Sequence, residues 1–159
     1  MPINLPETKQ PRIVIAGAGF AGITLAKRLS NKDYQVVILD RNNFHQFQPL
    51  LYQVAMSGIE PSSIAFPLRR LFRGKQNLHI RIAEIDSIHP EDKYLMTSEG
   101  RVNYDILVLA TGVTTNYYGN KEIEKNTYSL KSVADALYLR NAILSDLEKA
   151  LTVREDDIR

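Results

Sequence analysis

Residues 12–40 read RIVIAGAGFAGITLAKRLSNKDYQVVILD, and their pattern predicts two strands joined by a glycine turn and a helix. It begins with a continuous apolar run at 12–16, continues with a helix-like segment at 20–30 and ends with a second apolar run at 34–40. Continuous apolar runs are typical of strands that are buried on both faces of a parallel sheet. A strand, a helix and a strand within about 30 residues predict a βαβ unit with a right-handed crossover.

Three glycines follow the first strand in the spacing G-x-G-x-x-G, at positions 17, 19 and 22. In this motif Gly17 permits the tight turn, Gly19 lets a pyrophosphate approach the backbone, and Gly22 lets the helix lie close to the strand. The N-terminus of the helix contributes N–H groups and a partial positive charge. The triplet alone is weak evidence, but here it has the required strand before it and helix after it. It therefore predicts a dinucleotide site.

An acidic residue, Asp40, ends the second strand eighteen residues after Gly22. A carboxylate at this point accepts hydrogen bonds from an adenosine ribose and repels a 2′-phosphate, although Arg41 leaves an opening for one. The simpler interpretation is a side chain that caps a strand end at the surface. With the glycines in place, we favour the ribose role. NAD and FAD share this contact, so the motif alone does not separate them.

The rest of the chain predicts an α/β fold, in which a parallel sheet carries an inserted antiparallel meander. The expected elements are a helix at 61–73 that Pro67 interrupts, a strand at 78–82, a meander over 85–102, a buried strand at 104–110 and a helix at 133–151. Ser132 and Asp135 resemble a capping box at the start of the last helix. The apolar positions of that helix that fall near one face are Val133, Leu137, Leu144, Leu147 and Leu151.

The composition excludes several classes of function. The 159 residues carry a net charge of +2, which gives no reason to expect a nucleic-acid partner. There is no cysteine, so neither a disulfide nor a redox thiol pair can form within the chain. The histidines at 45, 79 and 89 do not have metal-ligand spacing, and we expect no metal site. No Ser-His-Asp order, pair of catalytic carboxylates or P-loop lysine points to a hydrolase or a kinase.

Two later stretches resemble known flavoproteins. Residues 106–112, ILVLATG, resemble the strand ending in A-T-G of two-dinucleotide-fold flavin reductases, in which this end passes near the flavin. Residues 40–55, DRNNFHQFQPLLYQVA, resemble the type II NADH dehydrogenases, which are single-subunit NADH:quinone oxidoreductases. The resemblance continues through 128–143. It implies a Rossmann-like FAD-binding domain, with FAD as the cofactor and NADH as the substrate of the full-length enzyme.

The resemblance also implies which residues bind the cofactor. They are Gly17, Ala18, Gly19, Phe20, Ala21, Gly22, Asp40, Arg41, Pro49, Leu50, Ile85, Ala110, Thr111 and Gly112. The related disulfide reductases carry a cysteine pair in the segment that corresponds to 40–55. The absence of cysteine here excludes that thiol chemistry, and we name no catalytic residue.

The resemblance further implies an incomplete domain. We expect a flexible N-terminus at 1–11, the first segment of the FAD-binding domain at 12–151 and a charged end at 152–159. A chain of this family needs a second dinucleotide fold for NADH, so we expect truncation before that domain and no activity of this fragment alone. For the full-length enzyme we expect quinone as a partner, homo-oligomerisation and peripheral attachment to the inner face of the cytoplasmic membrane.

Two alternatives stay open. The chain resembles other reductases of the same architecture, such as sulfide:quinone or ferredoxin reductases, and a non-catalytic dinucleotide-binding module is a further interpretation. Some polar and aromatic residues have simpler explanations than a site. We expect His45 to be structural or to line the flavin pocket, Tyr117 and Tyr118 to anchor a loop, and the basic residues Arg69, Arg70, Arg73 and Lys75 to form a solvated face.

Overall fold

The structure is a computed structural model that describes residues 1–152. The chain divides into two units, which are described separately. The first unit contains residues 1–45 and 66–113, and the second contains residues 46–65 and 114–152. The predicted charged end at 152–159 lies outside the described residues, except for its first position.

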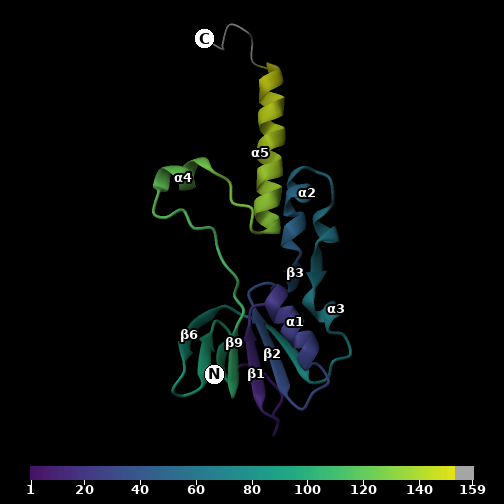
Figure 1. Cartoon of the computed structure of the whole chain (residues 1–159), viewed down its shortest axis with the longest axis vertical. Coiled ribbons are helices and arrows are strands. Elements are labelled where there is room, and N and C mark those ends of the chain that lie inside the picture. The colour runs from purple at the N-terminus through teal and green to yellow at the C-terminus, as the bar shows by residue number, and fades with distance from the viewer. Residues whose placement is uncertain (153–159) are drawn as a thin grey trace. The chain divides into compact units, whose positions relative to one another are not determined.

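The first unit is built on a four-stranded parallel sheet (Figure 1). Its strands are β1 (Arg12–Ala16), β2 (Gln35–Asp40), β5 (Leu78–Ile82) and β9 (Ile106–Leu109), in the order β5-β2-β1-β9. This confirms the predicted βαβ unit and all four predicted strands of the sheet. The strand β9 differs from expectation because it lies at an edge. Ile106 and Leu109 are therefore 48% and 63% exposed, although the strand is as apolar as β1.

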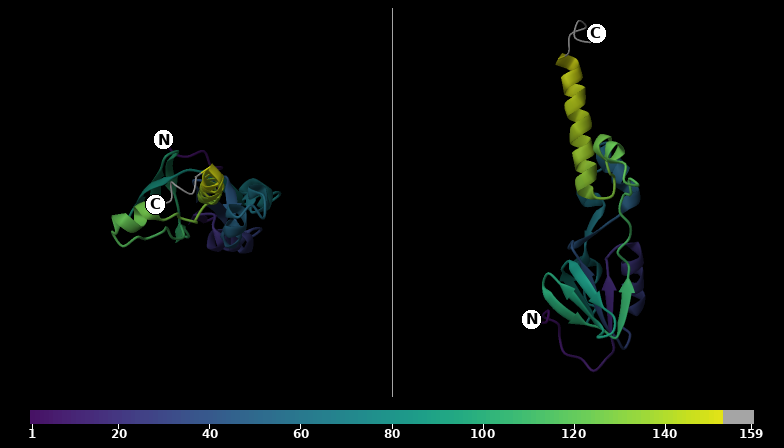
Figure 2. Two further views of the ribbon diagram at one scale, coloured as in Figure 1. Left: turned by 90° about the horizontal axis from the view of Figure 1, so that it is seen from above. Right: turned by 90° about the vertical axis from the view of Figure 1, so that its left-hand side faces the viewer.

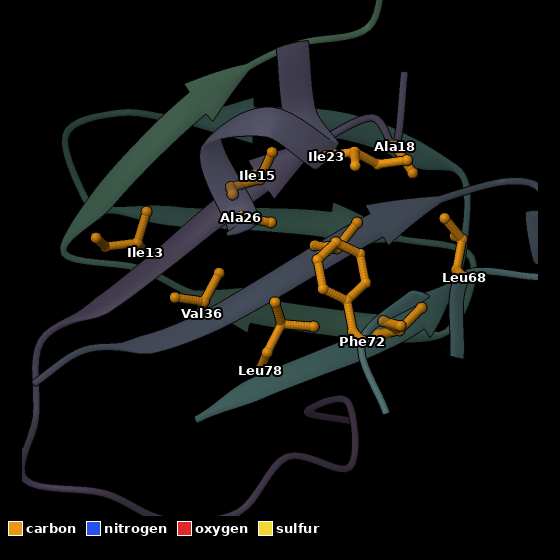
Figure 3. Packing of buried hydrophobic residues seen from close by; sticks show 11 residues of the cluster. Ile13, Ile15, Ala18, Ile23, Ala26, Val36, Leu68, Phe72 and Leu78 are labelled. Carbon is orange, nitrogen blue, oxygen red and sulfur yellow. The ribbon is translucent and has the colours of Figure 1, made fainter. Parts of the chain in front are cut away.

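Helix α1 (Phe20–Leu29) packs on one face of this sheet. Side chains from β1, β2, β5 and α1 converge there, together with Leu68 and Phe72 (Figure 3). Ile23 and Ala26 of the helix are buried, and Leu25 and Leu29 pack against the same cluster. These four apolar positions therefore lie on the side of the helix that faces the sheet.

The other face of the sheet packs against an antiparallel meander of β6 (Ile85–His89), β7 (Tyr94–Thr97) and β8 (Gly100–Asn103). Figure 2 shows the meander next to the parallel sheet within the first unit. Their shared apolar cluster consists of Val14, Val37, Leu39, Leu95 and Val102. The predicted insertion before the last strand is therefore confirmed.

The N-terminal residues, expected to be flexible, are hydrogen-bonded along this second face. Arg101 in β8 donates its N–H to Met1 O and accepts from Ile3 N–H, each at 3.0 Å. Gln35, which is only 3% exposed, donates from Nε2 to Pro6 O at 2.8 Å. Ile3 and Leu5 pack against the apolar cluster. Residues 1–6 thus cover apolar surface that would otherwise face water.

The prediction of an interrupted helix at 61–73 is only partly correct. A 3₁₀ turn, η2 (Pro61–Ser63), is followed by a short strand, β4 (Ala65–Pro67), and a single helical turn, α3 (Leu68–Leu71). The strand β4 pairs with β3 (Phe44–Gln46), which the sequence analysis did not predict. Proline disfavours helical backbone at the preceding residue, so the chain before Pro67 is extended rather than bent within a helix.

The second unit is helical. It contains η1 (Gln48–Leu50), α2 (Leu51–Ala55), α4 (Lys121–Asn126) and α5 (Val133–Thr152). Helices α2 and α5 lie side by side (Figure 1) and bury Leu51, Val54, Ile64 and Ala136. Of the predicted apolar face of α5, Val133 and Leu137 pack on this cluster. Leu144, Leu147 and Leu151 are exposed, because no described residue covers the later turns of the helix.

The capping box predicted for the last helix is present. Ser132 Oγ accepts the N–H of Asp135 at 3.1 Å, and Asp135 Oδ2 accepts the N–H of Ser132 at 2.9 Å. The same carboxylate oxygen accepts the N–H of Lys131 at 2.9 Å. These bonds satisfy N–H groups that would have no acceptor at the start of the helix.

We expect Ser132→Ala to lower the free energy of unfolding of the second unit by about 1 kcal/mol, because it removes an N-cap acceptor. Urea unfolding followed by far-UV circular dichroism measures this change. Ser145→Ala, at an exposed position of the same helix, is the matched control and is expected to cost nothing. Equal stability of the two variants would show that the cap does not stabilise the helix.

Candidate functional site

The glycine loop between β1 and α1 is fixed by close backbone contacts. Gly17 has φ of +106°, and a Cβ added to it would lie 2.3 Å from Ala110 O. A Cβ added to Gly22 would lie 1.9 Å from Gly17 O. No side chain fits at either position, so strand, loop and helix approach one another only because both residues are glycine. This agrees with the roles that the motif assigns to them.

Gly19 is different, because nothing in the protein requires a glycine there. Its φ of −73° and ψ of −167° are extended values that any residue adopts. A Cβ added to it would meet no atom within 4 Å. The space in front of Gly19 is therefore open, and a ligand that approaches the backbone closely would use it. Gly19 is also the N-cap of α1 without a capping side chain, so the first turn offers N–H groups toward an anion.

The Asp40 carboxylate is attached to the same loop. Its Oδ2 accepts the N–H of Ala18 at 2.6 Å, and its Oδ1 accepts the N–H of Asn42 at 2.7 Å. Each carboxylate oxygen has a further lone pair, so both can accept another hydrogen bond. Asp40 thus stabilises a strand end and remains able to accept from ribose hydroxyls. Arg41 beside it is exposed.

The A-T-G turn that follows β9 lies against the glycine loop. Ala110 donates its N–H to Ala16 O at 2.8 Å, which continues the pairing of β9 with β1. A Cβ added to Gly17 would lie 3.1 Å from Thr111 Cα. Gly112 has φ of +73°, which favours glycine, and a Cβ added there would meet open space. The structure therefore brings together two motifs about 90 residues apart in the sequence, as a parallel sheet places the carboxyl ends of its strands at one edge.

His45 contacts the loop more directly than the sequence analysis indicated. Its Nδ1 lies 3.1 Å from Ala18 O, and its ring meets the Phe20 ring edge-on with centroids 5.2 Å apart. Because a carbonyl oxygen only accepts, Nδ1 carries the hydrogen of this bond. His45 and Asp40 therefore hold the carbonyl and the N–H of Ala18. No sequence signal marks this role, because it depends on the position of β3.

Three predicted site residues are not among the contacts described for this loop. Ile85 begins β6 and packs against the apolar cluster under the meander. Pro49 and Leu50 belong to the second unit, where Leu50 packs against the core of α2 and α5. Their contact with a cofactor stays a prediction.

The described residues were also compared with the requirements of a metal site and of a membrane span. Within residues 1–152, no group of three His, Asp or Glu side chains is placed to hold a metal ion. In the same part of the chain, no helix has both the length and the apolar character that crossing a membrane requires. Tyr117 and Tyr118 lie in the second unit, and Tyr118 is exposed.

Gly22 and Gly19 predict different effects of one added methyl group. Gly22→Ala should lower the free energy of unfolding by about 2 kcal/mol or more, because its Cβ would overlap Gly17 O. Gly19→Ala should change it by less than about 0.5 kcal/mol, because its Cβ meets open space. Urea unfolding of both variants tests this contrast. A similar loss in both would mean that Gly19 is needed for folding rather than for a ligand.

Curated proteins similar to this chain include type II NADH:quinone oxidoreductase Ndh of Mycobacterium tuberculosis. It is 35% identical over 94% of this chain and 34% of the relative. The external alternative NAD(P)H-ubiquinone oxidoreductase B3, mitochondrial, of Arabidopsis thaliana is 31% identical over 91% of this chain and 27% of the relative. The chain thus spans about a third of the length of these relatives. The resemblance inferred from residues 40–55 is confirmed.

Solved structures show the same likeness. NDH2 of Plasmodium falciparum in complex with NADH has a TM-score of 0.83 and 26% identity, over 94% of this chain and 32% of that chain. The sulfide:quinone oxidoreductase of Aquifex aeolicus has a TM-score of 0.77 and 25% identity, over 85% of this chain and 32% of that chain.

A family model covers nearly the whole chain. The family is described as pyridine nucleotide-disulphide oxidoreductase, and its model matches residues 11–153. The match includes the glycine loop, Asp40 and the A-T-G turn, and FAD is the cofactor that a domain of this type implies. With the Rossmann-like sheet, the inserted meander and the glycine loop all in place, this chain belongs to the pyridine nucleotide-disulphide oxidoreductase family.

Proposed function

We propose that this chain is the FAD-binding N-terminal part of an NADH:quinone oxidoreductase. The observation that carries the proposal is the open backbone at Gly19, beside the helix N-terminus and the Asp40 carboxylate. The similarity to type II NADH:quinone oxidoreductases supports the choice of reaction.

The residues present fit the ADP half of FAD. The backbone of Gly17, Ala18 and Gly19 and the first turn of α1, from Phe20 through Ala21 to Gly22, would face the pyrophosphate. The Asp40 carboxylate would accept from the adenosine ribose, with Arg41 next to it. Among residues 1–152, no atom would lie within 4 Å of a Cβ added to Gly19, which leaves space in front of it.

The flavin half of FAD would extend past the A-T-G turn. Thr111 and Gly112 would border it, and Pro49, Leu50 and Ile85 complete the proposed contacts. When bound, FAD would supply the redox chemistry that connects NADH to a quinone. The residues of this chain bind and orient the cofactor, and we propose none of them as a catalytic residue.

Activity belongs to a longer protein than the part described. Because the chain spans about a third of its relatives, NADH binding, quinone binding, homo-oligomerisation and peripheral attachment to the inner face of the cytoplasmic membrane are proposed for the whole protein. We propose that the 159-residue chain alone does not oxidise NADH.

A second candidate, sulfide:quinone oxidoreduction, is favoured by the likeness to the Aquifex aeolicus enzyme. Sulfide oxidation uses cysteines, and this chain has none, so any such cysteines would have to lie elsewhere in the protein.

The two reactions are distinguished by assaying a protein that contains this chain together with its neighbouring sequence. The purified flavoprotein should reduce a soluble quinone with NADH and not with sulfide. Turnover with sulfide alone would favour the second candidate. Bound FAD with no turnover on either donor would favour a non-catalytic module.

We expect Asp40→Asn to weaken FAD binding by the 159-residue chain about tenfold, because a neutral amide accepts a weaker hydrogen bond from the ribose than a carboxylate does. The amide oxygen still accepts the N–H of Ala18, but the amide NH2 takes the place of the oxygen that accepts the N–H of Asn42, so that second bond is lost. Equilibrium dialysis against FAD gives the dissociation constant. Asp33→Asn, at an exposed position before β2, is the matched control and should bind as the original chain does. Unchanged affinity of Asp40→Asn would rule out the ribose contact.

A further inference from the structure

A hollow of about 210 Å³ lies at the free edge of β5, within the first unit. It is lined by Arg69, Phe72, Leu78, His79, Ile80 and Arg81, and it shares no residue with the dinucleotide site. Phe72, Leu78 and Ile80 are buried members of the core. The hollow therefore has an apolar base and three basic side chains around it.

The positive charge around the hollow has no compensating carboxylate in the local sequence. Between Glu60 and Glu84 there is no Asp or Glu, whereas the same stretch carries Arg69, Arg70, Arg73, Lys75 and Arg81. Among residues 1–152 the one ion pair, Lys149 with Asp146, lies in the other unit. Arg69, Arg70, Arg73 and Lys75 are expected from the sequence to form a solvated face, but Arg69 borders the hollow together with Arg81.

Two groups at the hollow have a lowered pKa, first because they are partly buried and then because positive charges lie nearby. Burial, Arg81 and Arg12 lower the pKa of His79. Burial and the nearby Arg69 lower the pKa of Arg81. Like charges that face one another in this way are a cost to the folded protein unless an anion binds between them.

Arg81 is held in a fixed position with donors to spare. Its Nε donates to Asn4 O at 2.7 Å, its Nη2 donates to the same oxygen, and its Nη1 donates to Ile80 O at 2.9 Å. A guanidinium group has five N–H groups. The three bonds therefore leave one N–H on each terminal nitrogen, which is the pair that binds two oxygens of a phosphate or carboxylate.

Protection of the free edge of β5 against pairing with other chains does not by itself explain this group of basic side chains. Charged side chains at a sheet edge prevent pairing with other chains, and a single arginine on β5 would serve that purpose. Here arginines from two elements, α3 and β5, and a histidine surround one hollow, and the N-terminal segment fixes one of the arginines.

We propose that the hollow formed by Arg69, His79 and Arg81 is a binding site for a phosphate-type oxyanion, separate from the dinucleotide site. Arg81 binds two oxygens of the anion, Arg69 supplies a second positive charge, and the His79 imidazole lies beside it. The apolar base allows the anion to be a free phosphate or the headgroup of a phospholipid.

The three histidines lie at three different places in the first unit, so their NMR resonances show where an anion binds. Inorganic phosphate is titrated into the 159-residue chain while the histidine resonances are followed by NMR over a range of pH. A bound anion favours protonated His79, so phosphate should raise its pKa and shift its resonance. His45 reports on the glycine loop and His89 on the meander, so binding at either of these places is distinguished from binding at the hollow.

The second probe is sedimentation with vesicles of phosphatidylglycerol, compared with vesicles of phosphatidylcholine.

Arg69→Gln is the decisive variant, because Arg69 is exposed and its loss should not affect folding. It should weaken phosphate or phosphatidylglycerol binding about tenfold, since a charge-assisted contact is lost. Arg28→Gln, an exposed arginine on α1, removes the same charge elsewhere and should have no effect. Binding of phosphatidylglycerol vesicles without free phosphate would identify the source as a lipid headgroup.

Two results would overturn the proposal. One is that neither probe binds in a way that changes the His79 resonance. The other is that Arg69→Gln and Arg28→Gln weaken binding equally, which would show attraction to net charge rather than a site. FAD binding should be unaffected by Arg69→Gln, so failure here leaves the proposed function untouched.

Discussion

The fold of the first unit depends on close contacts between backbone atoms at the carboxyl end of β1. These contacts leave no room for a side chain. Gly17 meets Ala110 O and Gly22 meets Gly17 O, each at a distance that leaves no room for a Cβ. These contacts fix the angle at which α1 leaves the sheet and the position of the turn after β9. The direction of the helix axis, and hence of its N–H groups, follows from them.

Two side chains then hold the loop in place before any ligand arrives. Asp40 accepts the N–H of Ala18, and His45 donates to its carbonyl oxygen. A loop that is already ordered loses less conformational entropy when a cofactor binds than a mobile one would. Asp40 thus serves both the fold and the proposed ribose contact. For this reason the stability of an Asp40 variant has to be measured beside its FAD affinity, because Asn keeps only one of the two backbone bonds of the carboxylate.

Much of this fold could be predicted from the sequence, because its decisive features are local. The apolar runs at 12–16 and 35–40 and the glycine spacing between them specify strand, turn and helix within one short segment. What could not be predicted depends on residues far apart in the chain. The order of strands puts β9 at an edge, the pairing of Arg101 with Met1 and Ile3 fixes the N-terminal segment, and β3 brings His45 to the loop. The same distinction between local and long-range features applies to the candidate sites. The motif predicted Gly19 and Asp40 as cofactor contacts, but the hollow beside β5 involves α3, which the sequence predicted as part of a longer helix.

The position of β1 in the middle of the sheet has a consequence for synthesis of the chain. Its neighbour β2 follows closely, but its other neighbour is β9, and Arg12 N–H bonds to Asp105 across 93 residues. At ribosomal rates of about 5–20 residues per second, one edge of β1 waits roughly 5–20 seconds for its partner. During that interval a strand that is apolar from Ile13 to Ala16 has an unpaired backbone edge. The nascent chain is therefore most exposed to wrong pairing just after its dinucleotide motif has formed, and the last strand of the sheet ends that period.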